Sequence, residues 1–221
     1  MIRERPGLGS LAASCLHGLF INRVFTWGNV TLELIDASVS LRGLTCFDLS
    51  YSHFSDELLS VVAEEGLSLR ELSLRGCQGY GYGGISFFFL RKCNNMQYFD
   101  LQLSRFLDDR CVIELSLPLG SLNIVKLSEN EKLTDLSLFA IMQNCPLITE
   151  IKMERTNVGK KKVKENCLVV NSNVKFFYLA HNSSLNDGSV KMIASVCPNM
   201  EMIDLRCCES VLEGALKVLR K

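Results

Sequence analysis

The most specific chemical pattern in the sequence is a run of glycines, Gly79, Gly81 and Gly84, spaced as G-x-G-x-x-G. In dinucleotide-binding proteins this spacing follows a strand and opens a helix, with an acidic residue about twenty positions further on. The apolar segment Leu69–Leu74 precedes the glycines, and Asp100 follows them at about that distance. However, Asp100 falls in the middle of a predicted strand and not at its end. We therefore interpret the glycines as residues that ease a lengthened turn, and not as a nucleotide site.

Histidines offer no second candidate for catalysis. His17, His53 and His181 lie in unrelated predicted loops. None has a metal-ligand partner four residues further on, and none stands in a recognisable nucleophile pattern. We interpret them as exposed loop residues. The sequence predicts no catalytic residue, metal site or cofactor.

The placement of the cysteines, ten in all, indicates a structural role and not a catalytic or metal-binding one. Cys77 and Cys208 each stand three residues after an apolar pair, while Cys93, Cys145 and Cys197 end predicted helices. A thiol at such a buried framework position acts as a small apolar group and a weak donor. The sequence has no C-x-x-C pair, which argues against a zinc site. We therefore expect free thiols in a reducing compartment, and hence a cytoplasmic or nuclear location.

Charge and hydropathy argue against two partner classes. Lys+Arg and Asp+Glu number 24 each, so the formal net charge is zero, whereas a general nucleic-acid binder usually has a basic excess. The basic run Lys160–Lys164 is interpreted as the solvated start of a helix, with a nuclear-import or phosphate-binding patch as the alternative. No apolar run is long enough for a membrane span, and the first residues lack the apolar core of a signal peptide. We expect neither nucleic acid nor membrane as a partner.

The glycines, histidines and cysteines described above all stand within a repeating sequence pattern. In Leu122–Asn130, apolar residues stand at the first, fourth and sixth positions and asparagine at the ninth. Steps of 26 residues, with small length changes toward the N-terminus, reproduce the pattern in seven units, which begin at Leu44, Leu69, Met96, Leu122, Ile148, Val174 and Met200. A unit of this length with the pattern L-x-x-L-x-L-x-x-N/C is the leucine-rich-repeat signature. The sequence therefore predicts an α/β leucine-rich-repeat solenoid.

Each unit is predicted to form a strand, a loop and a helix. In the central unit Asp135 is predicted to cap the helix, as Asp109 and Asp187 do at the same offset in other units. Pro146 then ends the helix, because proline disfavours helical geometry in the residue before it. Parallel strands stack about 4.8 Å apart and packed helices about 8–10 Å. We therefore expect a right-handed horseshoe with strands on the concave face and helices on the convex face.

The array is predicted to fill the chain, residues 1–221, as one domain. Residues 44–221 hold the seven repeats of about 26 residues, the last of them incomplete. Residues 1–43 are predicted as a truncated, irregular first repeat, with Leu8, Leu11 and Ala13 in its strand. No polar capping unit precedes this segment, although solenoids usually need one. We expect the chain to be the C-terminal part of a longer protein or a gene fragment.

Position nine of the repeats carries only small polar side chains or a thiol. We expect these side chains to form a buried ladder that bonds the loop backbone where each strand turns toward its helix. The predicted ladder consists of Ser52, Cys77, Ser104, Asn130, Thr156, Asn182 and Cys208.

The concave sheet is the predicted binding surface, because strand alternation exposes the third, fifth and seventh positions there. Aromatic and apolar residues stand beside lysines in these positions, and aromatic anchors bordered by charge are typical of a protein-binding patch. The alternative is that exposed strand positions tolerate any residue, so that the mixture has no meaning. We predict a binding patch formed by Tyr98, Asp100, Ile124, Lys126, Lys152, Phe176 and Tyr178.

The repeat boundaries resemble those of a known family. Two repeats end in Cys145-Pro146 and Cys197-Pro198, and two helices open with the similar segments Leu133–Asp135 and Leu185–Asp187. These features resemble the cysteine-containing leucine-rich repeats of F-box proteins.

Three further segments, Leu41–Ser50, Ser55–Leu59 and Ile148–Glu154, are similar to those of plant F-box/leucine-rich-repeat proteins. The resemblance implies that the horseshoe is the substrate-recognition part of an SCF-type ubiquitin ligase. The F-box itself is absent from the sequence. A Skp-type adaptor and a cullin are therefore expected as partners only if an F-box is supplied upstream.

The leading hypothesis is a non-catalytic protein-interaction scaffold that holds a target protein for ubiquitin-dependent degradation. The first alternative is a regulatory repeat protein such as a GTPase activator. That function would need an exposed arginine in a loop at the strand–helix edge, for which Arg75, Arg105 and Arg155 are the candidates. The second alternative is a truncated copy without function, which the missing cap suggests.

Overall fold

The strands form a single parallel sheet. The computed structural model describes residues 18–20, 43–64, 68–90, 95–161, 163 and 168–216. Within these ranges eight strands lie side by side in chain order. They are β1 (Gly18–Phe20), β2 (Cys46–Asp48), β3 (Glu71–Ser73), β4 (Tyr98–Asp100), β5 (Ile124–Lys126), β6 (Glu150–Lys152), β7 (Phe176–Tyr178) and β8 (Met202–Asp204). Every pair of neighbours keeps the same register, so equivalent repeat positions form columns across the sheet.

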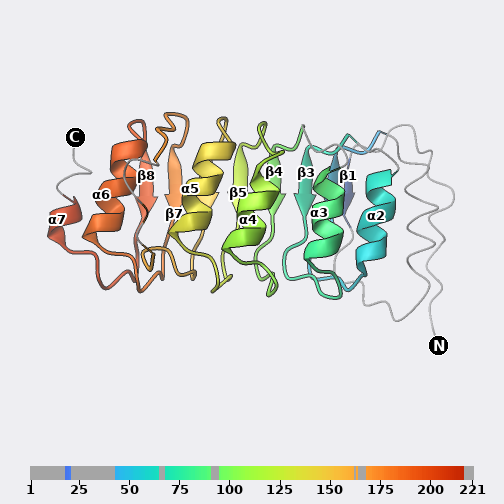
Figure 1. Ribbon diagram of the computed structural model, residues 1–221, viewed down its shortest axis with the longest axis horizontal. Coiled ribbons are helices and arrows are strands. Elements are labelled where there is room, and N and C mark those ends of the chain that lie inside the picture. The colour runs from blue at the N-terminus through green and yellow to red at the C-terminus, as the bar shows by residue number, and fades with distance from the viewer. Residues whose placement is uncertain are drawn as a thin grey trace.

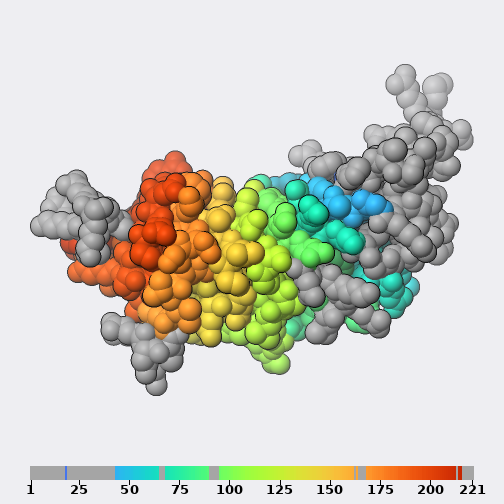
Figure 2. All heavy atoms as spheres, turned by 90° about the horizontal axis from the view of Figure 1, so that it is seen from above, coloured from blue at the N-terminus to red at the C-terminus, as the bar shows by residue number. Residues whose placement is uncertain are grey.

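Helices cover one side of the sheet (Figure 1). They are α2 (Asp56–Glu64), α3 (Tyr82–Leu90), α4 (Asp109–Ser116), α5 (Asp135–Asn144), α6 (Asp187–Val196) and α7 (Glu213–Leu216). Figure 2 shows the repeats following one another as bands of colour along the long axis. The predicted α/β repeat solenoid is therefore confirmed. Part of the basic run Lys160–Lys164, predicted as a helix start, lies outside the described residues.

The core lies between the two layers. In the central repeat Leu122, Val125 and Leu127 are at most 3% exposed. The middle residue of β5 is buried and its two neighbours are half-exposed, and β2, β6 and β7 share this pattern. On the helix side Leu138 and Ile141 of α5 are buried in the same core. Full burial of one such side chain stabilises the fold by about 1.5–3 kcal/mol.

The aspartates predicted as helix caps have a different role. Thr134 is the N-cap of α5 and Asn186 is the N-cap of α6. Asp135 and Asp187 are instead the first helical residues, and their carboxylates bond the backbone of the next repeat. Asp135 Oδ2, for example, accepts a hydrogen bond of 3.0 Å from the amide of Lys161. The predicted cap was wrong by one residue because threonine and asparagine satisfy the N-cap preference as well as aspartate does.

Asp109 joins three successive repeats. It follows the N-cap of α4 and accepts hydrogen bonds from the Thr134 amide (2.8 Å), the Thr134 hydroxyl (2.7 Å) and the Ser137 hydroxyl (2.6 Å). Lys161 Nζ lies 3.4 Å from the same carboxylate. Burial raises the pKa of Asp109, but the hydrogen bonds from Ser137 and Thr134 outweigh burial and hold this pKa below its usual value. The carboxylate form is therefore the one that holds the repeats together.

The first strand among the described residues, β1, was not predicted. β1 pairs with β2 so that Gly18 lies beside Cys46, 28 positions later in the chain. The predicted strand residues Leu8, Leu11 and Ala13 lie outside the described residues. Residues 16–21 have the pattern L-x-x-L-x-I, which marks this strand in the sequence. A fixed step of 26 residues passes over it.

The chain leaves each of the seven strands β2 to β8 through a residue in the left-handed region. Position eight of seven successive repeats has φ between 51° and 64°: Tyr51, Gly76, Leu103, Glu129, Arg155, His181 and Cys207. The amide at this position continues the sheet ladder, as Glu129 N does when it donates to Glu154 O (2.9 Å). Hydrogen bonding between repeats therefore extends beyond the three residues of each strand.

Candidate functional site

Two columns of side chains lie on the face of the sheet opposite the helices, here called the sheet face. The third-position column is Cys46, Glu71, Tyr98, Ile124, Glu150, Phe176 and Met202, and the fifth-position column is Asp48, Ser73, Asp100, Lys126, Lys152, Tyr178 and Asp204. Most of these side chains are half-exposed. Residues from distant parts of the chain therefore present one continuous surface.

Four residues of this surface form what we call the Tyr–Lys patch: Tyr98, Lys126, Lys152 and Tyr178. The two lysines are register partners on β5 and β6. Lys126 Nζ lies 4.8 Å from the centroid of the Tyr98 ring, and Lys152 Nζ lies 4.4 Å from that of Tyr178. A cation over an aromatic ring is attracted by the ring quadrupole. The patch thus combines aromatic surface with two positioned charges.

Apolar side chains lie beside the patch at third positions. Ile124 is the register partner of Tyr98, and Phe176 stands two residues before Tyr178 on β7. Both are half-exposed. All seven predicted binding residues therefore lie on the four neighbouring strands β4 to β7, and six of them are half-exposed.

Asp100, the seventh predicted residue, is only 3% exposed. Its carboxylate accepts hydrogen bonds from the Gln102 amide and side chain (both 3.0 Å) and from the Tyr98 hydroxyl (3.4 Å). Burial raises the pKa of Tyr98, and the neighbouring Asp100 adds to this effect. Asp100 therefore supports the ring on which Lys126 lies and is not itself an exposed contact.

The charge of the sheet face varies along the sheet. Asp48 and Glu71 make it acidic at β2 and β3, whereas Lys126 on β5 and Lys152 on β6 stand beside Glu150. At the acidic end, burial raises the pKa of Cys46 to about 11, with Glu71 and Asp48 adding to the effect. This thiol stays protonated near neutral pH, so it is a poor nucleophile.

The predicted ladder residues are all buried behind the loops that follow the strands. Asn130 Oδ1 accepts a hydrogen bond from Ser104 N (2.8 Å), while Nδ2 donates to Leu101 O and Leu127 O (both 2.9 Å). Asn182 makes the equivalent bonds two repeats later. These side chains join successive repeats and leave no polar group free for a ligand.

In two repeats a thiol takes the place of the ladder asparagine and bonds the backbone of the preceding repeat. Cys77 Sγ donates to Leu49 O (2.9 Å) and Cys208 Sγ donates to Leu179 O (3.2 Å). Burial raises the pKa of Cys77 to about 12, which keeps it in the donor form. These two cysteines thus act as small donors inside the framework.

The glycine run packs against the start of α2. Gly81 N donates to Asp56 Oδ1 (2.7 Å), and a Cβ atom on Gly84 would lie 2.5 Å from the same oxygen. Gly79 has φ +88°, and a Cβ atom there would lie 2.5 Å from Phe54 O. In a nucleotide site the Gly81 amide would have to bind a phosphate, but here it is already bonded to the Asp56 carboxylate. The structural interpretation of the glycines therefore fits this geometry.

Among the described residues, the candidate arginines and histidines form no second site. Arg75 lies over the Tyr51 ring at 5.6 Å, and Arg155 Nη1 lies 2.9 Å from Glu129 Oε1. Arg105 is exposed. His53 and His181 are exposed as expected, and His17 lies outside the described residues. No observation here favours an arginine poised for GTP hydrolysis.

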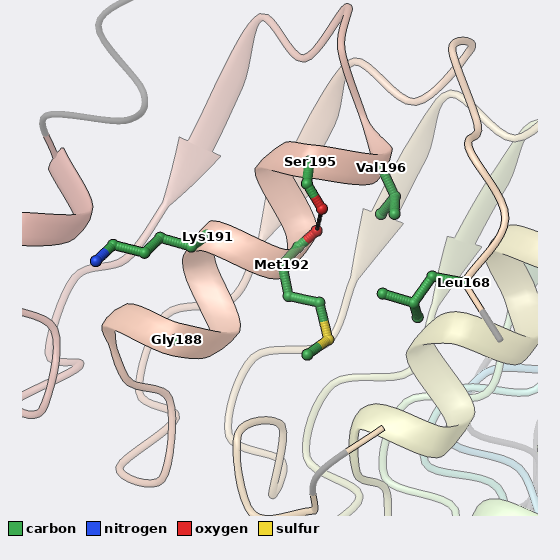
Figure 3. Close-up of a pocket in the computed structure, with 6 residues that line it drawn as sticks. All are labelled: Leu168, Gly188, Lys191, Met192, Ser195 and Val196. Atoms are coloured by element: carbon green, nitrogen blue, oxygen red, sulfur yellow. Dashed lines mark hydrogen bonds between the residues drawn. The ribbon is translucent and has the colours of Figure 1, made fainter. Parts of the chain in front are cut away.

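A hollow of about 430 Å³ opens beside α6 on the helix side. Its lining is Leu168, Gly188, Lys191, Met192, Ser195 and Val196. Figure 3 shows Leu168 and Met192 pointing into it, while Lys191 points away. The Ser195 hydroxyl donates to Met192 O (2.7 Å), so it is already bonded. The lining of the hollow is both polar and apolar, and its hydroxyl is already bonded.

Metal-binding clusters and membrane-spanning helices are both absent from the described ranges. No cluster of three or more His, Cys, Asp or Glu residues there could hold a metal ion. Among the helices of the same ranges, none is long and apolar enough to cross a bilayer.

Comparison with solved structures identifies the fold. A chain of the yeast Rad7 and Elc1 complex matches with a TM-score of 0.54 at 17% identity, over 92% of this chain and 53% of that one. A chain of the TLR13–ssRNA13 complex matches with a TM-score of 0.53 at 16% identity, over 87% of this chain and 29% of that one. The fold is a leucine-rich-repeat solenoid.

These matches concern the fold alone, because the identities are low. The chain spans about half of the first matched chain and less than a third of the second. No protein-family model matches the sequence, and no curated protein matches it.

Proposed function

We propose that the sheet face binds a partner protein and that the chain is a non-catalytic interaction scaffold. The observation that carries this proposal is the Tyr–Lys patch with Ile124 and Phe176 beside it. Aromatic side chains are enriched at protein interfaces, where a polar rim surrounds an apolar centre. Those of this surface stand on strands whose register is fixed by hydrogen bonds on both sides, so little ordering is needed on binding.

The finer role that we propose is substrate recognition for an SCF-type ubiquitin ligase. Two observations support it: the resemblance to plant F-box/leucine-rich-repeat proteins, and the fold similarity to a chain of the Rad7 and Elc1 complex. In this role the chain holds a protein substrate in the cytoplasm or nucleus, with no nucleic acid or membrane involved. A Skp-type adaptor and a cullin join through an F-box supplied upstream.

Photo-crosslinking tests the interaction face. A photoreactive amino acid replaces Ile124 on β5 in one variant and Arg110 on α4, whose side chain is 85% exposed, in the other. In plant extract the Ile124 variant should give discrete protein adducts that the Arg110 variant does not give. The further substitution Tyr178→Ala should weaken those adducts. Identical adducts from both positions would contradict binding at the sheet face.

A fusion experiment tests the ligase role separately. With an F-box fused upstream, the chain should bind a Skp-type adaptor and direct ubiquitin onto the crosslinked partner. Without the F-box the adaptor should not bind. A partner that is captured at the sheet face but never ubiquitinated by the fusion would keep the scaffold and exclude the ligase role.

A further inference from the structure

A carboxylate without a partner stands among the predicted binding residues. Glu150 is half-exposed on β6, and its register partners are the half-exposed apolar residues Ile124 on β5 and Phe176 on β7. The Glu150 carboxylate forms neither an ion pair nor a hydrogen bond with another residue of the described ranges. Its oxygens are hydrogen-bond acceptors. The carboxylate is therefore open to a donor from outside the chain.

The charges around Glu150 argue against a charged occupant. Lys152 stands two residues further along β6, and Lys126 is the register partner of Lys152 on β5. Both ammonium groups lie over tyrosine rings and form no ion pair with Glu150. A cation bound at Glu150 would meet two like charges, and an anion bound at the lysines would meet the carboxylate. A neutral hydrogen-bond donor meets no such repulsion.

The strand spacing fits a donor carried on an aromatic ring. Glu150 and Phe176 stand one strand spacing apart, about 4.8 Å, on the same face of the sheet. A second ring packed against Phe176 has its centroid about 4.5–7 Å from the Phe176 centroid. A hydroxyl at the far end of that ring points toward the next strand, where an O–H···O⁻ bond of about 2.5–2.7 Å is possible. Tyrosine has its donor at this end of the ring, whereas the indole N–H of tryptophan lies at its side.

We propose that Glu150 and Phe176 bind a tyrosine side chain of the partner protein. This inference rests on the proposed function and specifies one contact at the same site. The tyrosine ring lies against Phe176, and its hydroxyl donates to the Glu150 carboxylate. Ile124 stands on the other side of Glu150 and keeps water from this bond. A hydrogen bond that is shielded from water is electrostatically stronger.

Methyl NMR with the full chain tests the inference. Met202, half-exposed, is the register partner of Phe176, so its methyl signal reports a ring that binds there. Met192, half-exposed on α6, is the internal control on the helix side. The probe is a short neutral peptide with one tyrosine. Peptides of equal length carry phenylalanine, O-methyltyrosine, tryptophan, arginine or phosphotyrosine in its place. The tyrosine peptide should shift the Met202 signal with a Kd about fivefold lower than that of any other peptide.

Matched variants locate the hydrogen bond. Glu150→Leu removes the acceptor, so the tyrosine and phenylalanine peptides should bind this variant equally. Glu131→Leu, in the exposed loop after β5, should keep the fivefold difference. Persistence of the tyrosine preference in Glu150→Leu, or its loss in Glu131→Leu, would overturn the inference.

The peptide series can also contradict the inference in the unchanged chain. Equal binding of the tyrosine and O-methyltyrosine peptides would overturn it, as would tighter binding of the tryptophan, arginine or phosphotyrosine peptide. An equal or larger shift of the Met192 signal would overturn it as well. Absence of peptide binding together with crosslinks at Ile124 would overturn the inference and keep the proposed function; absence of both would overturn both.

Discussion

Replacing one ladder asparagine measures how strongly the repeats are joined. Asn182 is fully buried. Its Oδ1 accepts from the amide and the hydroxyl of Thr156 (both 2.9 Å), and its Nδ2 donates to Met153 O (2.8 Å) and Leu179 O (2.9 Å). Asn182→Ala removes all four bonds. Met153 O keeps the Thr156 hydroxyl (3.0 Å) and Leu179 O keeps the Cys208 thiol (3.2 Å), so the Thr156 amide is the group left without this partner.

The magnitude follows from these contacts. A buried amide without an acceptor costs about 1–3 kcal/mol, and each of the other lost bonds contributes about 0.5–1 kcal/mol. We expect Asn182→Ala to lower the free energy of unfolding by about 3–5 kcal/mol, which is a large part of the stability of an ordinary domain. Urea unfolding followed by circular dichroism measures this loss, and hydrogen exchange at the Thr156 amide should become faster.

Asn199 is the matched control, because it is exposed and its Nδ2 donates to Ser172 O (3.0 Å) at the surface. Asn199→Ala should change the free energy of unfolding by no more than about 0.5 kcal/mol. A loss below about 1 kcal/mol for Asn182→Ala, or equal losses in the two variants, would refute the reasoning that the buried ladder side chains join the repeats strongly.

Three further predictions concern the scaffold. Gly79→Ala should lower the free energy of unfolding by about 2 kcal/mol because of its φ of +88° and the close Phe54 O. Gly120→Ala, with nothing within 4 Å of the added Cβ, should change it little, and similar urea midpoints would contradict this. Asp109 has a lowered pKa, so its stabilising contribution is present above its unfolded pKa of about 3.9 and is lost as the pH falls through the folded pKa. Urea unfolding at about pH 6 and pH 3 should therefore show a smaller pH dependence in Asp109→Asn than in the unchanged chain. His181→Val should cost about 1–2 kcal/mol, because a branched side chain fits a φ of +61° poorly. His181→Asn should cost almost nothing, and equal costs would show that the left-handed conformation does not limit the choice of residue.

The scaffold was predictable because its signals are local and repeated. Leu122, Val125 and Leu127 alternate as a half-buried strand requires, and the same spacing recurs in every repeat of residues 44–221. Asn130 and its equivalents mark the end of each strand. A period, once found, places residues far apart in the chain side by side, which is how the seven predicted binding residues could be grouped without a structure.

Other features depend on contacts that a period does not contain. Asp100 has the same strand position as Lys126, yet it is buried because Gln102 and Tyr98 donate to it. The Lys126 ammonium lies over a ring on β4 and the Lys152 ammonium over a ring on β7. Each contact joins two repeats, so the pattern of a single repeat does not predict it. The strand β1 was missed because its distance to β2 is 28 residues and not 26.

The left-handed residue at position eight explains why the sheet face can vary while the framework stays constant. This conformation costs about 1–2 kcal/mol for a residue other than glycine, and six of the seven residues are not glycine. The cost is offset because the same turn lets the position-eight amide bond the next repeat and brings the position-nine side chain under the loop. Neither contact uses the side chains at positions three and five. Those side chains are therefore free to change with the partner, and the pairing of each patch lysine with a tyrosine on another strand is a property of the surface that the framework does not require.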